Sequence, residues 1–169
     1  MKTFMALAAL LSGIILFPAA SAQTAAPAPQ AQAQPLSPVA AALSELTPIS
    51  GSFNKDADYF IYLYSASWCG PCRAIMPRIA QLYKDKLSKD KRIEIILLDL
   101  DVTEEDARKY VAHYDAGFFA VMGHGNNSDK LPGAYPVRGI PHCIAVDKNG
   151  NRIFSGHAAI IFRDIEKLR

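Results

Sequence analysis

Residues 65–73 read Ser-Ala-Ser-Trp-Cys-Gly-Pro-Cys-Arg, and this stretch decides the fold. It joins an aromatic and β-branched run, residues 59–64, to a segment with helical periodicity, residues 72–87. The first run has no polar interruption, which is typical of a strand buried on both faces of a sheet. Cys69 and Cys72 therefore stand where a buried strand ends and a helix begins.

The neighbouring segments extend this unit into an α/β fold. A second uninterrupted apolar strand is predicted for residues 93–100, so the helix before it connects two parallel strands. Pro77 lies within that helix and is expected to kink it, because proline removes a backbone donor and clashes with the preceding turn. Thr103 and the three acidic residues after it predict a second helix that runs to about His113.

The C-terminal half predicts a hairpin and a closing helix. Residues 116–136 are Gly- and Asn-rich and are expected to form a surface loop, with a short apolar piece at 118–121. Asp147-Lys148-Asn149-Gly150 separates two short apolar runs, and Asn-Gly is the strongest short hairpin signal. Helices are predicted for residues 39–46 and 159–168. The order β-α-β-α-β-β-α predicts a mixed sheet with helices on both faces.

The N-terminus predicts export. Lys2 is followed by an uncharged run of 14 residues at 4–17 and by Ala20-Ser21-Ala22, which has the form of a signal-peptide cleavage site. We expect residues 1–22 to be a signal peptide cleaved after Ala22, residues 23–38 to be a disordered Ala/Pro/Gln-rich tether, and residues 39–169 to fold. The protein is then periplasmic or secreted. An uncleaved membrane anchor is the alternative.

Composition limits the function classes. The chain has 169 residues, 50% of them hydrophobic, which is enough for one domain with its own core. A net charge of +2 excludes a strongly basic nucleic-acid binder. Three cysteines do not make a multi-bridge disulfide framework, and the odd number leaves at least one thiol unpaired within the chain.

The spacing of Cys69 and Cys72 predicts redox chemistry. Cys69 is expected at the helix N-terminus, where unpaired N–H groups and the helix dipole stabilise a thiolate and make it the nucleophile. Cys72 returns to the same helix face within disulfide reach and is expected to be the more buried, resolving thiol. Pro71 suits the first helical turn. A zinc site formed with His142 and Cys143 is a weaker alternative, and we predict no metal and no cofactor.

Residues 65–73, with Pro77 five residues beyond Cys72, resemble the thioredoxin superfamily. They are most similar to its tryparedoxin and nucleoredoxin-like branch. A second motif, Val-Arg-Gly-Ile-Pro at 137–141, agrees with that resemblance, which implies a thioredoxin fold. It also implies that Pro141 is cis beside the disulfide and that the Ile140 backbone pairs with a bound substrate strand. The expected substrate-binding residues are Trp68, Gly70, Pro71, Ile140, Pro141 and His142.

Several positions depart from the family pattern or have two interpretations. Many thioredoxins have a buried acid where this chain has Leu63, so the proton on Cys72 must leave by another route. Trp68 is either a contact surface or a core residue, and His142 either tunes Cys69 and contacts substrate or is a bystander. Cys143 is expected to be a buried, inert thiol. Asp99 and Asp101 are expected to be solvated at a strand end.

The resemblance and the thiol chemistry together predict an exported thiol:disulfide oxidoreductase that reduces protein disulfides. Because an oxidising compartment offers no reduced pool, a membrane-bound thiol electron donor is the expected partner. We expect a monomer. One alternative is a disulfide oxidase or isomerase, and another is a redox-inactive module that binds extended peptides. The loop at 116–136 is either a substrate-selecting element or an ordinary surface insertion.

Overall fold

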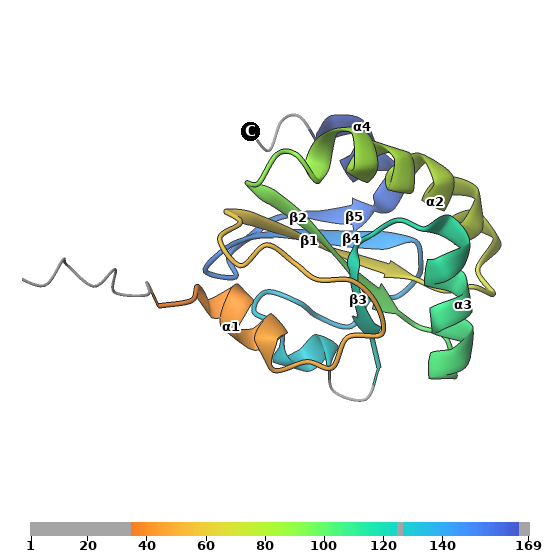
Figure 1. Ribbon diagram of the computed structural model, residues 1–169, viewed down its shortest axis with the longest axis horizontal. Coiled ribbons are helices and arrows are strands. Elements are labelled where there is room, and N and C mark those ends of the chain that lie inside the picture. Colours follow the sequence, from red (N-terminus) through yellow and green to blue (C-terminus); the bar gives the residue numbers. More distant parts are fainter. Residues whose placement is uncertain (1–34, 125–126, 166–169) are drawn as a thin grey trace, which may run out of the picture. The chain divides into compact units, whose positions relative to one another are not determined.

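A computed structural model describes residues 35–124 and 127–165 of the chain. It contains one five-stranded mixed sheet in the order β3-β2-β1-β4-β5 (Figure 1). The strands are β1 (Tyr59–Ser65), β2 (Ile93–Asp99), β3 (Phe119–Met122), β4 (His142–Asp147) and β5 (Arg152–His157). The helices are α1 (Pro38–Ser44), α2 (Gly70–Leu82), α3 (Glu104–Tyr114) and α4 (Ala158–Asp164), with a π-helical turn at Tyr83–Leu87 and a 3-10 turn at Ser128–Lys130.

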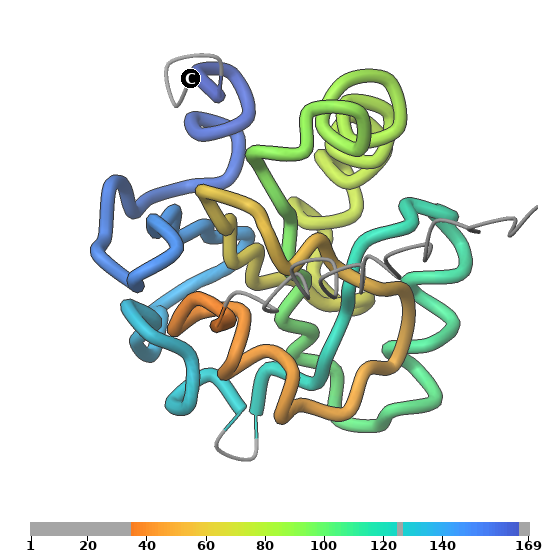
Figure 2. Tube along the Cα trace, turned by 60° about the vertical axis from the view of Figure 1, so that its left-hand side comes forward, coloured from red at the N-terminus to blue at the C-terminus, as the bar shows by residue number. Residues whose placement is uncertain are grey.

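The central strand β1 is buried on both faces, as its sequence predicts. It pairs in parallel with β2 on one side and antiparallel with β4 on the other. Because successive side chains of a strand point to opposite faces, Ile61 and Leu63 pack in the core beneath α2, α3 and α4. Phe60, Tyr62 and Tyr64 pack on the opposite face, against α1. Figures 1 and 2 show α2 and α4 on one side of the sheet and α1 on the other.

The segment at 116–136 is not a continuous surface loop, and this prediction is wrong. Phe119–Met122 form β3, the edge strand that pairs in parallel with β2. A bridge between Ser50 and Ala120 holds its other side. Four residues are too few to show periodicity, so the apolar run at 118–121 gave no sign that neighbouring chain would pair with it.

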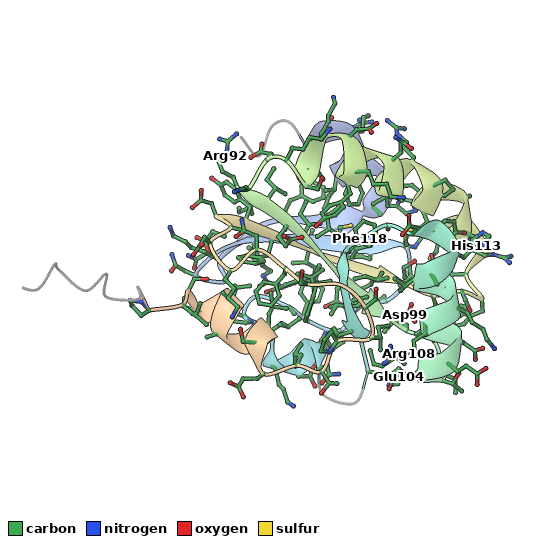
Figure 3. All side chains as sticks on the ribbon, in the orientation of Figure 1. Arg92, Asp99, Glu104, Arg108, His113 and Phe118 are labelled. Atoms are coloured by element: carbon green, nitrogen blue, oxygen red, sulfur yellow. A yellow bond between two sulfur atoms is a disulfide. The ribbon has the colours of Figure 1, made fainter. Side chains whose placement is uncertain are left out.

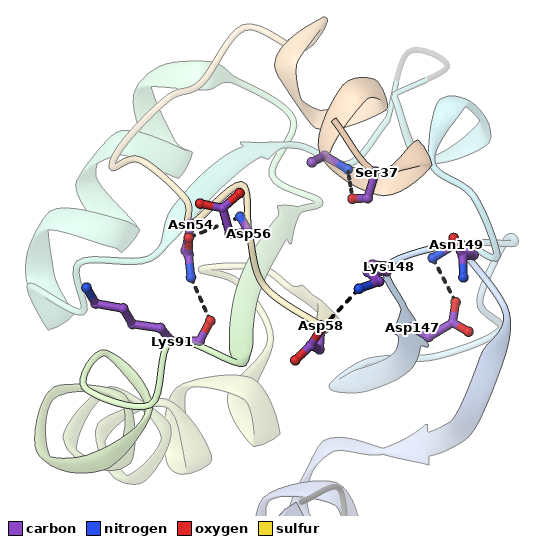
Figure 4. A network of polar contacts seen from close by, with 9 residues as sticks. Ser37, Asn54, Asp56, Asp58, Lys91, Asp147, Lys148 and Asn149 are labelled. Atoms are coloured by element: carbon purple, nitrogen blue, oxygen red, sulfur yellow. Dashed lines mark hydrogen bonds and ion pairs between the residues drawn. The ribbon is translucent and has the colours of Figure 1, made fainter. Parts of the chain in front are cut away.

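The hairpin between β4 and β5 forms where Asn-Gly predicts it. The carboxylate of Asp147 accepts hydrogen bonds from the backbone N–H groups of Asn149 (2.8 Å) and Asn151 (2.9 Å). Lys148 donates its backbone N–H to the carbonyl of Asp58 (2.9 Å) and its Nζ lies 3.4 Å from the Asp58 carboxylate (Figure 4). The turn is thereby fixed to the start of β1.

Helix α1 has a side-chain cap at its N-terminus. Ser37 accepts the backbone N–H of Ala40 at 3.2 Å through its Oγ, and Pro38 occupies the first turn. On the opposite side of the sheet, α2 continues past Pro77 to Leu82 before the π-helical turn.

The predicted signal peptide at 1–22 and most of the tether at 23–38 lie outside the described residues. So does the end of the last predicted helix, residues 166–168. Within 35–124 and 127–165, no helix combines the length and the apolar character needed to cross a membrane.

Replacing Leu43 by alanine tests whether α1 belongs to the core. Leu43 is fully buried against the sheet, so Leu43→Ala is expected to lower the free energy of unfolding in urea by about 2–4 kcal/mol. The matched control is Leu36→Ala, because Leu36 is 44% exposed. It is expected to change that free energy by less than about 0.5 kcal/mol. Equal effects of the two substitutions would contradict the packing.

Candidate active site

The turn after β1 places Cys69 at the N-terminus of α2. Cys69 is the N-cap residue, and its Sγ accepts the backbone N–H of Cys72 at 3.1 Å. Pro71 lies in the first turn, where its missing N–H leaves no unpaired donor. The two cysteines form a disulfide, with their Cα atoms 5.2 Å apart. A sulfur at this position faces the free N–H groups of the helix, which favour negative charge on it.

The disulfide lies just beneath the surface beside an exposed tryptophan. Cys72 is fully buried and Cys69 is 5% exposed, so the order of burial is the predicted one. Trp68 is 62% exposed, which excludes a core role for its ring. Gly70 and Pro71 are also exposed. Trp68, Gly70 and Pro71 therefore form an accessible rim around Cys69.

The second motif meets the disulfide from the start of β4. The Ile140–Pro141 peptide bond is cis, as the resemblance implies. The Sγ of Cys69 lies 3.8 Å from the carbonyl oxygen of Ile140, and the Ile140 side chain packs on the cluster that contains both cysteines. Two segments about 70 residues apart in the sequence are thus in contact at the disulfide.

Residues His142 and Cys143 follow the proline and have different environments. His142 is half-buried, and its Nε2 lies 2.8 Å from the Oγ of Ser155 on β5. Burial, and then the nearby His157, lower the pKa of His142. Cys143 is fully buried opposite Leu63, and burial raises the pKa of its thiol well above the ordinary value. Its burial is confirmed, and a buried neutral thiol is unreactive.

The position of the missing family acid is apolar. Leu63 is fully buried and pairs with Leu97 of β2 and Cys143 of β4. No carboxylate occupies this level of the sheet at these three paired positions. The chain therefore differs from acid-containing thioredoxins in the residues that surround the base of α2.

Asp99 and Asp101 are buried, and the prediction that they are solvated is wrong. They are 0% and 1% exposed. Asp101 accepts the backbone N–H of Ser67 through both oxygens (3.0 and 3.1 Å) and the Ser67 Oγ–H at 2.8 Å. The aspartate that holds Ser67 thereby fixes the turn that carries Trp68 and Cys69. A strand-end position gave no sign that the following loop would cover both side chains.

Asp99 contributes an unpaired oxygen to this buried pair. Its Oδ1 accepts the backbone N–H of Asp101 at 2.8 Å, but its Oδ2 has no hydrogen-bond partner among the described residues. It lies at the end of β2, on the side of the sheet that α3 covers (Figure 3). Burial, and then the neighbouring Asp101 carboxylate, raise the pKa of Asp99 to about 7.

A groove of about 790 Å³ opens on the cis-proline side of the disulfide. Its wall is made by the loop before β4, the first residue of β4 and the last residue of β5. The lining residues are Tyr135, Pro136, Val137, Arg138, Gly139, Ile140, Pro141, His142 and His157. Ile140, Pro141 and His142 were expected from the sequence, whereas Tyr135 and His157 were not, because no motif marks them.

Among the residues that the structure describes, no group of three or more His, Cys, Asp or Glu side chains is placed to hold a metal ion. Cys69 and Cys72 are bonded to each other and Cys143 is enclosed in the core. The geometry at the cysteines is that of a dithiol–disulfide pair.

Comparisons with known proteins agree with this geometry. A family model described as Thioredoxin-like matches residues 56–152. A thiol-disulfide oxidoreductase of Bacillus cereus, ResA, is 37% identical over 84 residues, which are 50% of this chain and 46% of the relative. The nucleoredoxin of Xenopus laevis is 26% identical over 115 residues, 68% of this chain and 28% of its own. The matches thus span half or less of the length of these relatives.

Solved structures show the same fold. Tryparedoxin I from Leishmania major is 25% identical, with a TM-score of 0.53 over 64% of this chain and 75% of its own. Tryparedoxin II from C. fasciculata is 24% identical, with a TM-score of 0.59 over 76% and 90% of the two chains. The thioredoxin fold and the resemblance to tryparedoxins and nucleoredoxins are confirmed.

Replacing Asp99 by asparagine tests the buried acid pair. A raised pKa means that the folded protein binds the proton more tightly than the unfolded chain. As pH rises above the ordinary pKa of 3.8, the unfolded chain releases this proton more readily than the folded protein does, so the free energy of unfolding falls. The loss is complete above about pH 7. Asp99→Asn keeps the Oδ1 acceptor and removes the charge. It is expected to raise the free energy of unfolding at pH 8.5 by about 2–4 kcal/mol and to give little gain at pH 4.

The measurement is urea unfolding of the oxidised protein at both pH values. Asp56→Asn is the matched control, because Asp56 is exposed, and its effect is expected to be small at both. A gain from Asp99→Asn that does not grow with pH would contradict the prediction, because it would show that folding does not raise the pKa of Asp99.

Proposed function

Because the chain belongs to the thioredoxin-like family, we propose that it is an exported thiol:disulfide oxidoreductase that reduces protein disulfides through Cys69 and Cys72. The observation that carries the proposal is the position of the Cys69–Cys72 disulfide. It lies at a helix N-terminus, just beneath the surface, and in contact with Ile140 beside the cis-proline. That arrangement combines a stabilised thiolate with a place for a substrate chain.

The reaction follows from the chemistry of the two thiols. In the reduced protein, the Cys69 thiolate attacks one sulfur of a substrate disulfide, forms a mixed disulfide and releases the other sulfur as a thiolate. The N–H of Cys72, 3.1 Å from Sγ, favours the thiolate before the attack. Cys72 then loses its proton and attacks Sγ of Cys69, which releases the second substrate thiolate. Two electrons pass to the substrate, and the protein is left with the Cys69–Cys72 disulfide.

A reductase that works in an oxidising compartment requires a source of electrons. Residues 1–22 have the features of a cleaved signal peptide, so the site would work in the periplasm or outside the cell. Each turnover leaves the disulfide, and an oxidising compartment does not reduce it. A membrane-bound thiol donor would restore the dithiol by thiol–disulfide exchange, in which the donor thiolate attacks Cys69 of the disulfide. The exposed rim at Trp68, Gly70 and Pro71 gives such a donor access.

Cys72→Ser tests the assignment of the two thiols. Without a resolving thiol, Cys69 is expected to remain joined to substrate, so mixed disulfides accumulate and are seen as reducible adducts by non-reducing electrophoresis and mass spectrometry. Cys69→Ser is the matched control, because it retains one thiol of the pair, buried Cys72, and is expected to trap little. Cys143→Ala is expected to leave trapping by Cys72→Ser unchanged.

Adducts that map to Cys143, or equal trapping by Cys69→Ser, would contradict the roles of the thiols. No adduct with any variant, together with unchanged peptide binding, would favour a redox-inactive binding module.

The reduction potential tests the direction of the reaction. Trp68 is the only tryptophan and adjoins Cys69, so its fluorescence reports the state of the pair during equilibration with dithiothreitol or glutathione. A reductase is expected to have a potential near that of thioredoxin, about −270 mV. A value near about −120 mV would instead indicate an oxidase, and one near about −180 mV an isomerase.

A further inference from the structure

The groove beside Cys69 has positive charge and no negative charge on its wall. None of its lining residues, 135–142 and His157, is Asp or Glu. Arg138 is exposed on this wall, and Arg152 lies over the ring of Tyr135, with its guanidinium carbon 5.1 Å from the ring centroid. Neither arginine forms an ion pair with a carboxylate in the described part of the chain. Both charges are available to a bound molecule.

Hydrogen bonds across β5 fix the groove wall. The hydroxyl of Ser155 lies 2.5 Å from the Tyr135 hydroxyl and 2.8 Å from Nε2 of His142. The hydroxyl of Tyr64 in the core donates to the carbonyl of Tyr135 at 3.3 Å. The rings of Tyr135 and His142 meet edge to face. Arg152 therefore packs on a wall that these hydrogen bonds hold in place. Less conformational entropy is then lost when a ligand binds to the Arg152 guanidinium.

The backbone of the wall is free to pair. Among the described residues, no backbone–backbone hydrogen bond involves residues 136–140. Apart from the Ile140 carbonyl, which lies 3.8 Å from Cys69 Sγ, their N–H and C=O groups therefore lack the backbone partners that a covered loop has. An extended chain laid along this segment would satisfy them and would bring its own sulfur toward Cys69, since Ile140 contacts Sγ.

We propose that this groove selects substrate segments that carry carboxylates next to the reactive disulfide, with Arg138 and Arg152 as the residues that recognise them. The occupant is an extended acidic peptide segment of a disulfide-bearing protein. The inference rests on the proposed reductase function and adds the substrate class. The side chains of Arg138 and Arg152 act on binding and have no part in the thiol exchange.

The test uses three synthetic peptides with one internal disulfide and no tryptophan. They differ only at the residues flanking the cysteines, which are Glu, Gln or Lys. The reduced protein is mixed with each peptide in a stopped-flow instrument, and Trp68 fluorescence gives the second-order rate constant. At low salt, the Glu peptide is expected to react roughly fivefold faster than the Gln peptide, and the Lys peptide more slowly than both. Added salt is expected to reduce these differences.

Arg138→Gln and Arg152→Gln are each expected to reduce the preference for Glu. Arg78→Gln is the matched control, because Arg78 is an exposed arginine of α2 that does not line the groove, and it is expected to preserve the preference. Equal rates for the three peptides, or the same effect from Arg78→Gln as from Arg138→Gln, would overturn the inference. Dependence on Arg138 that is equally large for oxidised glutathione would show recognition of any anionic thiol compound and would also overturn it.

A neutral disulfide, 2-hydroxyethyl disulfide, separates this inference from the proposed function. The wild type and Arg78→Gln are both expected to reduce it, and at equal rates, because Arg78 does not line the groove. If the protein fails to reduce it and all peptides, the reductase function fails. If it reduces everything without regard to charge, the reductase function stands and the selection of acidic segments is wrong.

Discussion

The antiparallel register between β1 and β4 is the constraint on which the rest of the site depends. Tyr64 pairs with His142, so the carboxyl end of β1 lies beside the amino end of β4. The chain leaves β1 at Ser65 and reaches Cys69 after one short turn, and it enters β4 from Pro141. A shift of one residue would turn every side chain of β4 to the other face. The core on both sides of the sheet therefore fixes the contact between Cys69 and Ile140.

Burial on both faces accounts for where polar groups occur in the sheet. Along β1, all residues from Phe60 to Leu63 are apolar or aromatic, and polar side chains begin only at the end that carries the site. Ser65 hydrogen-bonds the hydroxyl of Tyr110 at 2.8 Å, and Asp101 holds Ser67. Buried polar groups cost free energy unless they are paired, so each pair fixes the chain that it touches. Among the described residues, Oδ2 of Asp99 is the exception, and burial, followed by the neighbouring Asp101 carboxylate, raises the pKa of this group.

The sequence predicted the parts of the fold that depend on local rules. The strands at 59–64 and 93–100, the helix start at Thr103 and the Asn-Gly hairpin have short-range signals, and each appears within a few residues of its predicted bounds. The disulfide was predicted from the spacing of Cys69 and Cys72, and the cis-proline from the family resemblance of the motif at 137–141. The formation of β3 and the burial of Asp99 and Asp101 depend on contacts with segments far away in the sequence. Such contacts leave no short-range pattern from which they could be predicted. His157 joins the groove because β5 brings it opposite His142, and Tyr135 joins it because its ring meets the ring of His142.

The two functions of the site are carried by different elements. The sulfur atoms belong to the start of α2, whose N–H groups set the charge on Cys69, whereas the groove belongs to the cis-proline loop and β5. The two meet at one contact, that of Ile140 with Cys69. Arg138 lines the groove and Arg152 packs on the ring of Tyr135, so neither arginine belongs to the helix whose N-terminus carries Cys69. Under the proposed function, substitutions of these arginines change which substrate disulfide reaches Cys69, whereas the thiol exchange itself depends on α2.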